Sequence, residues 1–219
     1  MPDGWAWHWV VQQDGPGNVD DLLPADDARI SFGAGRRSGP AVTQNLALAR
    51  AEGELVRVLD ADDQLTPAAL ARDIDVLTSE SRVGWAASRV LDLLPDGFTV
   101  GFLLDPSPGP IARGSRAAAL VGPRLSSAGT PSDVVHAPKL AFPAWGWMAL
   151  PASEDTGLLL ALNAVSTGCF ISKPGLLYRK LPGQTTASAE HSDPSELSAR
   201  RKLIEARTTA LLCLDPASP

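Results

Sequence analysis

The chain has 219 residues, of which 44% are hydrophobic and 20% charged, a balance typical of a soluble protein with one large domain. Its formal net charge of −6 argues against a general nucleic-acid-binding surface, and its longest apolar runs are too short to span a bilayer. The first residues lack the pattern of a secretory signal, and Cys169 and Cys213 form no CxxC pair, so we expect a cytoplasmic protein with reduced, buried cysteines.

The first part of the chain predicts strands and a helix in α/β order. Residues 5–13 alternate as a strand with large side chains on both faces, and His8 within it is expected to pack rather than bind a ligand. A second strand is expected at 29–32. Between residues 33 and 39 lies a cationic, glycine-rich loop without P-loop spacing, and a helix is expected at 41–52. The predicted buried face of this helix holds Val42, Leu46 and Ala49.

Residues 55–59 run directly into the carboxylates Asp60, Asp62 and Asp63. The short, branched, apolar segment predicts a buried strand, and ligands of open α/β sheets bind beyond the carboxyl ends of strands. Carboxylates at that place favour a hard divalent cation such as Mg²⁺ or Mn²⁺, which keeps positions open for the phosphates of a substrate. The alternative interpretation is a solvated acidic turn before a helix.

The middle of the chain predicts one more helix and a hairpin. Thr66 is expected to cap the helix and Pro67 to occupy its first turn. A long irregular segment such as 122–151 is usually functional or mobile. In chain order we expect a helix that buries Leu70, Ile74 and Leu77, a strand at 83–87, a hairpin of 90–94 with 98–103 closed at 95–97, a loop at 105–110 and a short helix at 116–121.

The last third predicts a buried helix and a final amphipathic one. Trp145 and Trp147 flank a glycine and could form a wall for a sugar, although packing is the commoner role of a tryptophan. Residues 153–155, Ser-Glu-Asp, open a leucine-rich helix at 156–165, and their charges suit the positive helix N-terminus. We further expect a stop at Gly168, strands at 169–172 and 176–179, a solvated basic face at 200–202, and a helix from Asp193 that buries Leu197, Ile204, Thr208 and Leu211.

The order of these pieces resembles a family 2 glycosyltransferase of the GT-A fold, over residues 9–188. The segments that carry the resemblance are 10–15 (VVQQDG), 44–48 (QNLAL), 59–63 (LDADD), 146–147 (GW), 153–156 (SEDT) and 177–179 (LYR). The resemblance implies an α/β fold with a mixed, Rossmann-like sheet flanked by helices, as a single domain over 1–214 with a disordered tail at 215–219.

The resemblance also assigns roles to single residues. Asp14 matches the aspartate that reads the nucleotide base, and Asp60 the one that contacts the ribose. Asp62, the second acid of the DXD motif, matches the residue that coordinates a divalent metal on the diphosphate. Asp155 matches the general base of inverting members. The matched segments add Asn45 and Trp147 to the nucleotide-sugar site.

Two features depart from the family pattern. Relatives usually carry a strand and a helix before the segment that starts here at Trp5, so the resemblance implies an N-terminally shortened domain. We expect an open sheet edge or an incomplete nucleotide pocket, and an open edge makes a homo-oligomer plausible. In addition, Gln13 and Trp145 stand where many relatives carry a second acid and a glycine.

The implied function is inverting, metal-dependent transfer of a sugar from a UDP-, GDP- or dTDP-sugar to an acceptor hydroxyl, with Mn²⁺ or Mg²⁺ as cofactor. Two alternatives stay open at this point. A catalytically weak relative could serve as a binding or partner module, which the missing first strand favours. A nucleotidyltransferase on a similar sheet fits the helix start at 153–155 less well.

Overall fold

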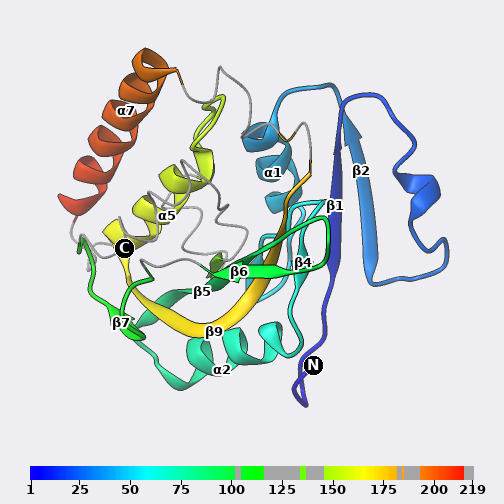
Figure 1. Cartoon of the computed structure of the whole chain (residues 1–219), viewed down its shortest axis with the longest axis horizontal. Coiled ribbons are helices and arrows are strands. Elements are labelled where there is room, and N and C mark those ends of the chain that lie inside the picture. The colour runs from blue at the N-terminus through cyan, green and yellow to red at the C-terminus, as the bar shows by residue number, and fades with distance from the viewer. Residues whose placement is uncertain (102–104, 116–133, 137–145, 182–183, 185–192, 215–219) are drawn as a thin grey trace.

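The computed structural model describes residues 1–101, 105–115, 134–136, 146–181, 184 and 193–214 (Figure 1). Its helices and strands, in chain order, are β1 (Trp9–Asp14), the 3₁₀ turn η1 (Asp20–Leu22), β2 (Ile30–Gly35), α1 (Pro40–Leu48), β3 (Val56–Arg57), β4 (Gln64–Leu65), α2 (Ala69–Ser79), β5 (Val83–Leu93), β6 (Thr99–Gly101), β7 (Gly109–Ile111), β8 (Val134–His136), α5 (Glu154–Val165), β9 (Thr167–Arg179) and α7 (Pro194–Leu212).

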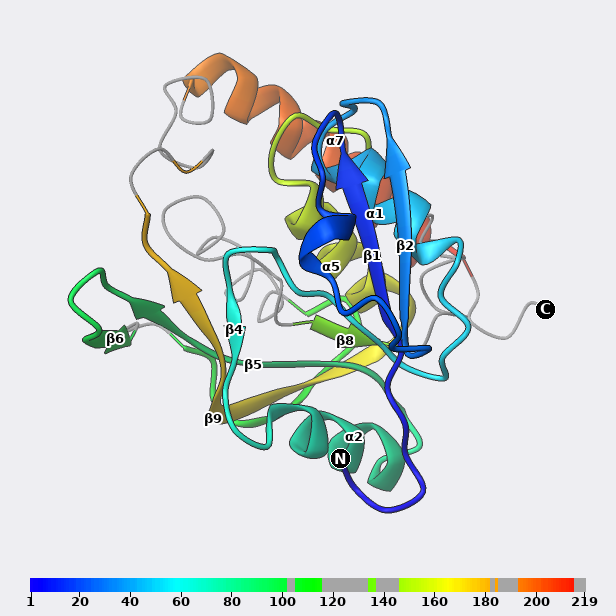
Figure 2. The same cartoon turned by 90° about the vertical axis from the view of Figure 1, so that its right-hand side faces the viewer.

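The strands form two sheets, and helices cover both faces of the larger one. β1 and β2 pair in parallel, from Trp9 opposite Ile30 to Asp14 opposite Gly35. The larger sheet is mixed, with the order β3-β8-β5-β9-β4, and β6 and β7 are attached to β5 and β9. Helices α5 and α7 lie on one side of it and α2 on the other (Figures 1 and 2). This arrangement confirms the expected α/β fold.

The first sheet is small, and neither of its outer edges has a further strand partner within the described residues. There β1 pairs with β2 alone, so the other edge of β1 has no strand partner in the part of the chain that the structure describes. Trp9 and Phe32, on the same face of this sheet, are 47% and 36% exposed. Self-association through this edge stays a prediction.

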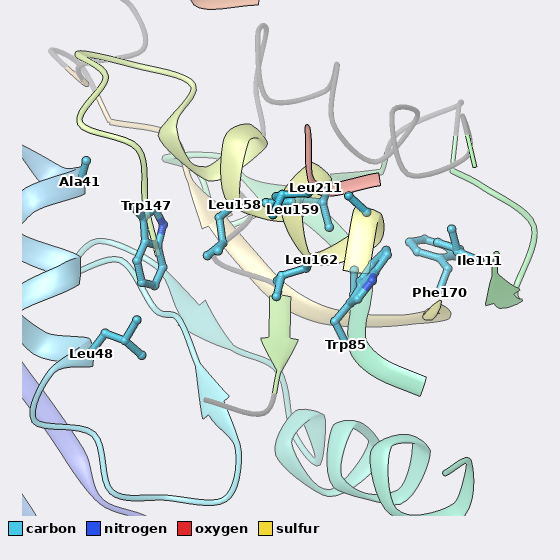
Figure 3. Close-up of a cluster of buried hydrophobic side chains, with 13 residues drawn as sticks. Ala41, Leu48, Trp85, Ile111, Trp147, Leu158, Leu159, Leu162, Phe170 and Leu211 are labelled. Atoms are coloured by element: carbon cyan, nitrogen blue, oxygen red, sulfur yellow. The ribbon is translucent and has the colours of Figure 1, made fainter. Parts of the chain in front are cut away.

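The parallel pair of β5 and β9 carries the core. Trp85 on β5 is fully buried, and its indole lies against Gly168 on β9, where a Cβ atom would overlap the ring. Leu159 and Leu162 of α5 are also fully buried and pack over the same region (Figure 3). The sequence predicted that Gly168 ends the preceding helix, and this prediction was wrong. Gly168 lies within a strand and makes room for a tryptophan.

A buried ion pair fixes α2 to the opposite face of the large sheet. Arg57 Nη1 of β3 contacts Asp73 Oδ2 of α2 at 2.6 Å, and the two side chains are 8% and 1% exposed. Ser88 Oγ of β5 donates a hydrogen bond of 3.2 Å to the other oxygen of Asp73. Burial nevertheless raises the pKa of the Asp73 carboxyl, although the charge of Arg57 opposes this shift.

Helix α1 is shorter than predicted and buries a different face. It ends at Leu48, and its buried residues are Ala41 and Leu48 rather than the predicted stripe. Leu46 is 47% exposed, and Ala49, beyond the helix, is exposed too. The prediction was wrong because α1 has two apolar neighbours, β1 on one side and α5 on the other, so no single stripe describes its packing.

The segment around the acidic residues contains less strand than predicted. Instead of a buried strand over 55–59, only Val56–Arg57 pairs, with β8. Thr66 is not the cap of α2, which begins at Ala69 after a left-handed Ala68. The Thr66 hydroxyl instead donates to the Pro174 carbonyl at 2.6 Å. The segment before α2 is thus held by a hydrogen bond to β9, and α2 has no side-chain cap.

The two longest strands are continuous where the sequence predicted breaks. β5 runs through both predicted segments, and β9 continues past Pro174 with a register shift between Ile171 and Pro174. The hairpin of β5 with β6 is confirmed, closed at Gly97 with a φ of 86°. Strand β1 begins at Trp9, four residues later than predicted.

Several predictions concern the ends and the surface of the chain. Helix α7 begins as predicted, with Asp193 Oδ1 accepting from the amides of Ser195 and Glu196. Both cysteines are free, but Cys169 is only half-buried and Cys213 is exposed, whereas both were predicted to be buried. His8 is exposed as well, whereas packing was predicted. The predicted helix at 116–121, Trp145 and the tail at 215–219 lie outside the described residues. No described helix combines the length and hydropathy needed to cross a membrane.

Gly168→Ala is expected to lower the free energy of unfolding by about 1–3 kcal/mol, because the new methyl group forces the Trp85 ring or β9 to move. Urea denaturation followed by tryptophan fluorescence measures this change. Gly101→Ala is the matched control, since its Cβ would meet only the tip of Leu91 at 3.4 Å. Equal stability of the two variants would contradict the prediction.

Candidate functional site

The acidic segment forms a tight turn that the end of β9 holds in place. The amide of Asp63 donates to the Asp60 carbonyl at 3.1 Å. Asp63 is 8% exposed, and its carboxylate accepts the backbone N–H of Arg179 at 3.1 Å. The Arg179 side chain donates through Nε to the Asp62 carbonyl at 2.9 Å. Asp63 is therefore a structural member of the turn.

Asp62 is half-buried at the same turn. Its Oδ2 accepts a hydrogen bond of 3.1 Å from Gln184 Nε2, which also donates to the Arg179 carbonyl at 2.6 Å. The sequence analysis did not single out Gln184, because only the folded chain brings its amide to Asp62. No signal in the single sequence marks it as part of this turn.

A hard cation suits the chemistry of this turn but would find few protein ligands there. Carboxylate oxygens such as those of Asp62 are ligands for Mg²⁺ and Mn²⁺. In the described ranges no group of three or more His, Cys, Asp or Glu side chains is arranged to hold a metal. These residues fit a cation that takes one or two protein carboxylates and completes its shell with phosphate oxygens and water.

Asp155 lies in the first turn of α5, with one carboxylate oxygen held by an indole group. Trp147 Nε1 donates to Asp155 Oδ1 at 2.6 Å, and the side chain of Gln44 from α1 is close enough to lower the pKa of Asp155. Burial raises the pKa of Asp155 well above its ordinary value, and the charges of Glu154 and Asp60 add to the shift. The side chains of Trp147 and Gln44 oppose this shift only in part.

Glu154 makes the start of α5 a cluster of carboxylates. It is 9% exposed, and its pKa is raised by burial and by Asp60, against the opposing charge of Arg200 on α7. Arg200 itself is only 4% exposed. The prediction that it belongs to a solvated basic face was therefore wrong. Asp60, Glu154 and Asp155 thus lie within electrostatic reach of one another, although they come from distant parts of the chain.

Asn45 of α1 and Trp147 form a two-point contact. Asn45 Nδ2 donates to the Trp147 carbonyl at 2.9 Å, and the Trp147 amide donates to Asn45 Oδ1 at 3.0 Å. The Trp147 ring is 4% exposed and packs with the core between α1 and Leu158 (Figure 3). The ring is therefore part of the core and does not form an open wall, while its binding role stays a prediction.

Asp14 lies at the N-terminal end of α1. Its two carboxylate oxygens accept the amides of Ser38 and Gly39 at 2.6 and 3.1 Å, just before the helix begins. The hydrogen bond from Ser38 is the largest cause of a lowered Asp14 pKa. The neighbouring Gln13 makes three hydrogen bonds, to the carbonyls of Gly15 and Gly17 and from the Val19 amide. Both side chains order the loops around β1.

Similarity to known proteins is found at the level of the fold. The chain matches the structure of S. aureus TarS 1-349 in complex with UDP-GlcNAc with a TM-score of 0.69 and 16% identity, over 94% of this chain and 58% of that one. For TarS 1-349 in complex with UDP the TM-score is 0.61 and the identity 13%, over 97% and 68%. No protein-family model matches the sequence, and no curated protein does.

The TarS structures have the GT-A fold. The match therefore shows that this chain has the GT-A fold, in agreement with the resemblance seen in the sequence. The chain spans 58% of the length of the first of these structures.

Asp155→Asn is expected to raise the melting temperature near pH 8. The folded-state pKa of Asp155 lies above the ordinary 3.8, so keeping the carboxylate ionised costs stability at pH values above both. That cost is relieved as the pH falls through the folded-state pKa toward 3.8. Asparagine removes the charge and keeps an acceptor for the indole N–H.

The measurement is a melting curve of each protein near pH 8 and near pH 4, at constant ionic strength. The gain should be largest at the higher pH and shrink toward the lower one. Asp75→Asn, at an exposed position of α2, is the control for the loss of one negative charge. A variant that is less stable than the wild type near pH 8 would show that the carboxylate supports the helix.

Proposed function

We propose that the chain binds a nucleotide-diphospho-sugar and transfers its sugar, with inversion, to an acceptor hydroxyl. One observation carries this proposal: Trp147 Nε1 holds the Asp155 carboxylate by a hydrogen bond of 2.6 Å at the start of α5, where Asp60 of the acidic turn is close enough to raise the pKa of both Glu154 and Asp155. On a GT-A fold, this supports a donor site beside a group able to take a proton. The TarS structures in complex with UDP-GlcNAc and with UDP make UDP-sugars the first donors to test.

Asp155 is the residue we assign as general base. Its raised pKa makes the ionised carboxylate a stronger base than a solvated aspartate. In the proposed reaction Asp155 takes the proton of the acceptor hydroxyl. The acceptor oxygen then bonds to the anomeric carbon of the sugar, and the bond from that carbon to the diphosphate oxygen breaks.

Asp62 is the residue that would hold Mn²⁺ or Mg²⁺, with Asp60 beside it facing the ribose. When bound, the cation would stabilise the charge on the leaving nucleoside diphosphate. Gln184 would keep the Asp62 carboxylate oriented through its 3.1 Å hydrogen bond, as partners of ligating carboxylates commonly do. Support for this assignment is the type of ligand and the position of the turn.

A second candidate is a relative that binds a donor or a partner without turnover. Two observations favour it: the strand pair of β1 and β2 stands apart from the large sheet, and both oxygens of Asp14 are already engaged by backbone amides. A base-reading role for Asp14 would have to compete with those bonds. Nucleotide binding without release would support this candidate.

The deciding experiment measures nucleotide release from a panel of UDP-, GDP- and dTDP-sugars, with Mn²⁺ or with a chelator. Thermal shift with the same ligands reports binding independently of turnover, because a ligand of the native state raises its apparent stability. Nucleoside triphosphates form a separate arm for nucleotidyl transfer. The absence of both release and thermal shift across the panel would contradict the proposed function.

Asp62→Asn is expected to abolish the part of donor binding that depends on Mn²⁺ while leaving the fold intact, because the residue is half-buried at the turn and outside the core. Isothermal titration calorimetry of the folded variant measures it. Asp75→Asn controls for net charge. Donor affinity that still responds to Mn²⁺ in the Asp62 variant would remove this residue from the metal site.

Asp155→Asn is expected to lower turnover by roughly a hundredfold or more, the range for losing a general base. Donor affinity should stay close to that of the wild type, because the amide keeps the size of the side chain. Steady-state kinetics and calorimetry on one preparation separate the two quantities. Wild-type turnover in this variant would rule out Asp155 as the base.

A further inference from the structure

We propose that Asn45 is a positioning residue for Asp155, which acts through the backbone and the indole of Trp147 rather than by touching the nucleotide sugar. This inference rests on the proposed function in one respect, namely that Asp155 is the base. It reassigns Asn45 and Trp147, which the sequence resemblance placed in the nucleotide-sugar site.

The first step is the contact between the Asn45 amide and the Trp147 backbone. One end of the amide donates at 2.9 Å and the other accepts at 3.0 Å, so its orientation and its distance from the main chain are both determined. Gly146 adopts a φ of 60°, and a Cβ there would overlap Asn45 Oδ1. Arg207 of α7 donates to the Gly146 carbonyl at 2.9 Å from another direction.

The second step is the locked ring of Trp147. The ring packs between Ala41 and Leu48 of α1 and Leu158 of α5, and this close packing restricts its rotation relative to the backbone (Figure 3). The backbone position therefore determines where the indole N–H points. That N–H donates to Asp155 Oδ1 at 2.6 Å.

The third step is the arrangement of polar groups on α1. Asn45 reaches Asp155 through Trp147, and the preceding residue, Gln44, lies close enough to lower the pKa of the same carboxyl. Consecutive amides of one helix thus face the Asp155 site, and Asn45 holds the carboxylate through the indole. A displacement of about 1 Å at a reacting group can cost roughly a hundredfold in rate, so this support has a large effect on turnover.

The test compares the kinetics of Asn45→Ala and Trp147→Phe, the latter keeping an aromatic ring without the N–H. Each is expected to lower kcat by about tenfold to a hundredfold with KM for the donor within about twofold. The double variant should lose less than the product of the two, because both changes break the same chain of contacts. Independent, multiplicative losses would overturn the proposal.

Asn163→Ala is the matched structural control. Asn163 is 2% exposed on the same helix as Asp155, and its side chain donates to the Ala112 carbonyl at 3.1 Å. Its loss should lower the melting temperature without changing kcat. If Asn45→Ala does not fold, Asn45→Asp takes its place, since it keeps the acceptor for the Trp147 amide and replaces the donor with a charged oxygen that cannot bond the Trp147 carbonyl.

A readout independent of activity is the indole cross-peak of Trp147 in a ¹⁵N–¹H spectrum, assigned by its absence in Trp147→Phe. Asn45→Ala should move this cross-peak in the same direction as Asp155→Asn, because both weaken the indole–carboxylate bond. An unmoved cross-peak, or a loss confined to donor KM, would overturn the proposal. If no protein releases nucleotide but the cross-peak moves as expected, the proposed function fails while the positioning contact stands.

Discussion

The close approach of β5 and β9 is the constraint on which the rest of the structure depends. The fully buried Trp85 indole occupies the space that a side chain at Gly168 would fill, so the two strands and α5 above them share one tightly packed centre. From there β9 runs on to Arg179, which holds the acidic turn. A feature of the core thus determines where the polar site can lie.

The site concentrates negative charge in a partly dry place, and this is costly for the folded chain. Burial and mutual repulsion raise the pKa values of Glu154 and Asp155. The charge of Arg200 offsets only part of the shift of Glu154. Sites of catalysis are where such unfavourable arrangements are commonly retained. The buried pair of Arg57 and Asp73 is different, because each charge there has a direct partner at 2.6 Å.

The sequence predicted the parts of the structure that depend on local signals. Helix α5 is read from its leucines, α7 from its cap at Asp193, and the β5–β6 hairpin from its Pro-Asp-Gly turn. It missed the buried face of α1, which packs between two partners, and the continuity of β9 past Pro174. Both depend on neighbours that are distant in sequence.

In the candidate site too, the parts with a local sequence signal were predicted, and the parts that depend on distant residues were not. Carboxylates after a short apolar segment and at a helix start are visible in one sequence, so Asp62 and Asp155 could be singled out, and the family resemblance implied their roles. The contact of Asn45 with Trp147 joins residues 102 positions apart, and that of Gln184 with Asp62 joins residues 122 apart. Amides at such separations carry no local pattern that predicts a partner.

The continuity of α5 and β9 has a consequence for the motions of the molecule. Ser166 alone separates the end of α5 from the start of β9, so residues 154–179 form one stretch with Asp155 near its beginning and Arg179 at its end. Native proteins open in contiguous cooperative units. Amide hydrogens of this stretch should therefore exchange together, and an opening that frees the carboxylate from the indole also releases the acidic turn.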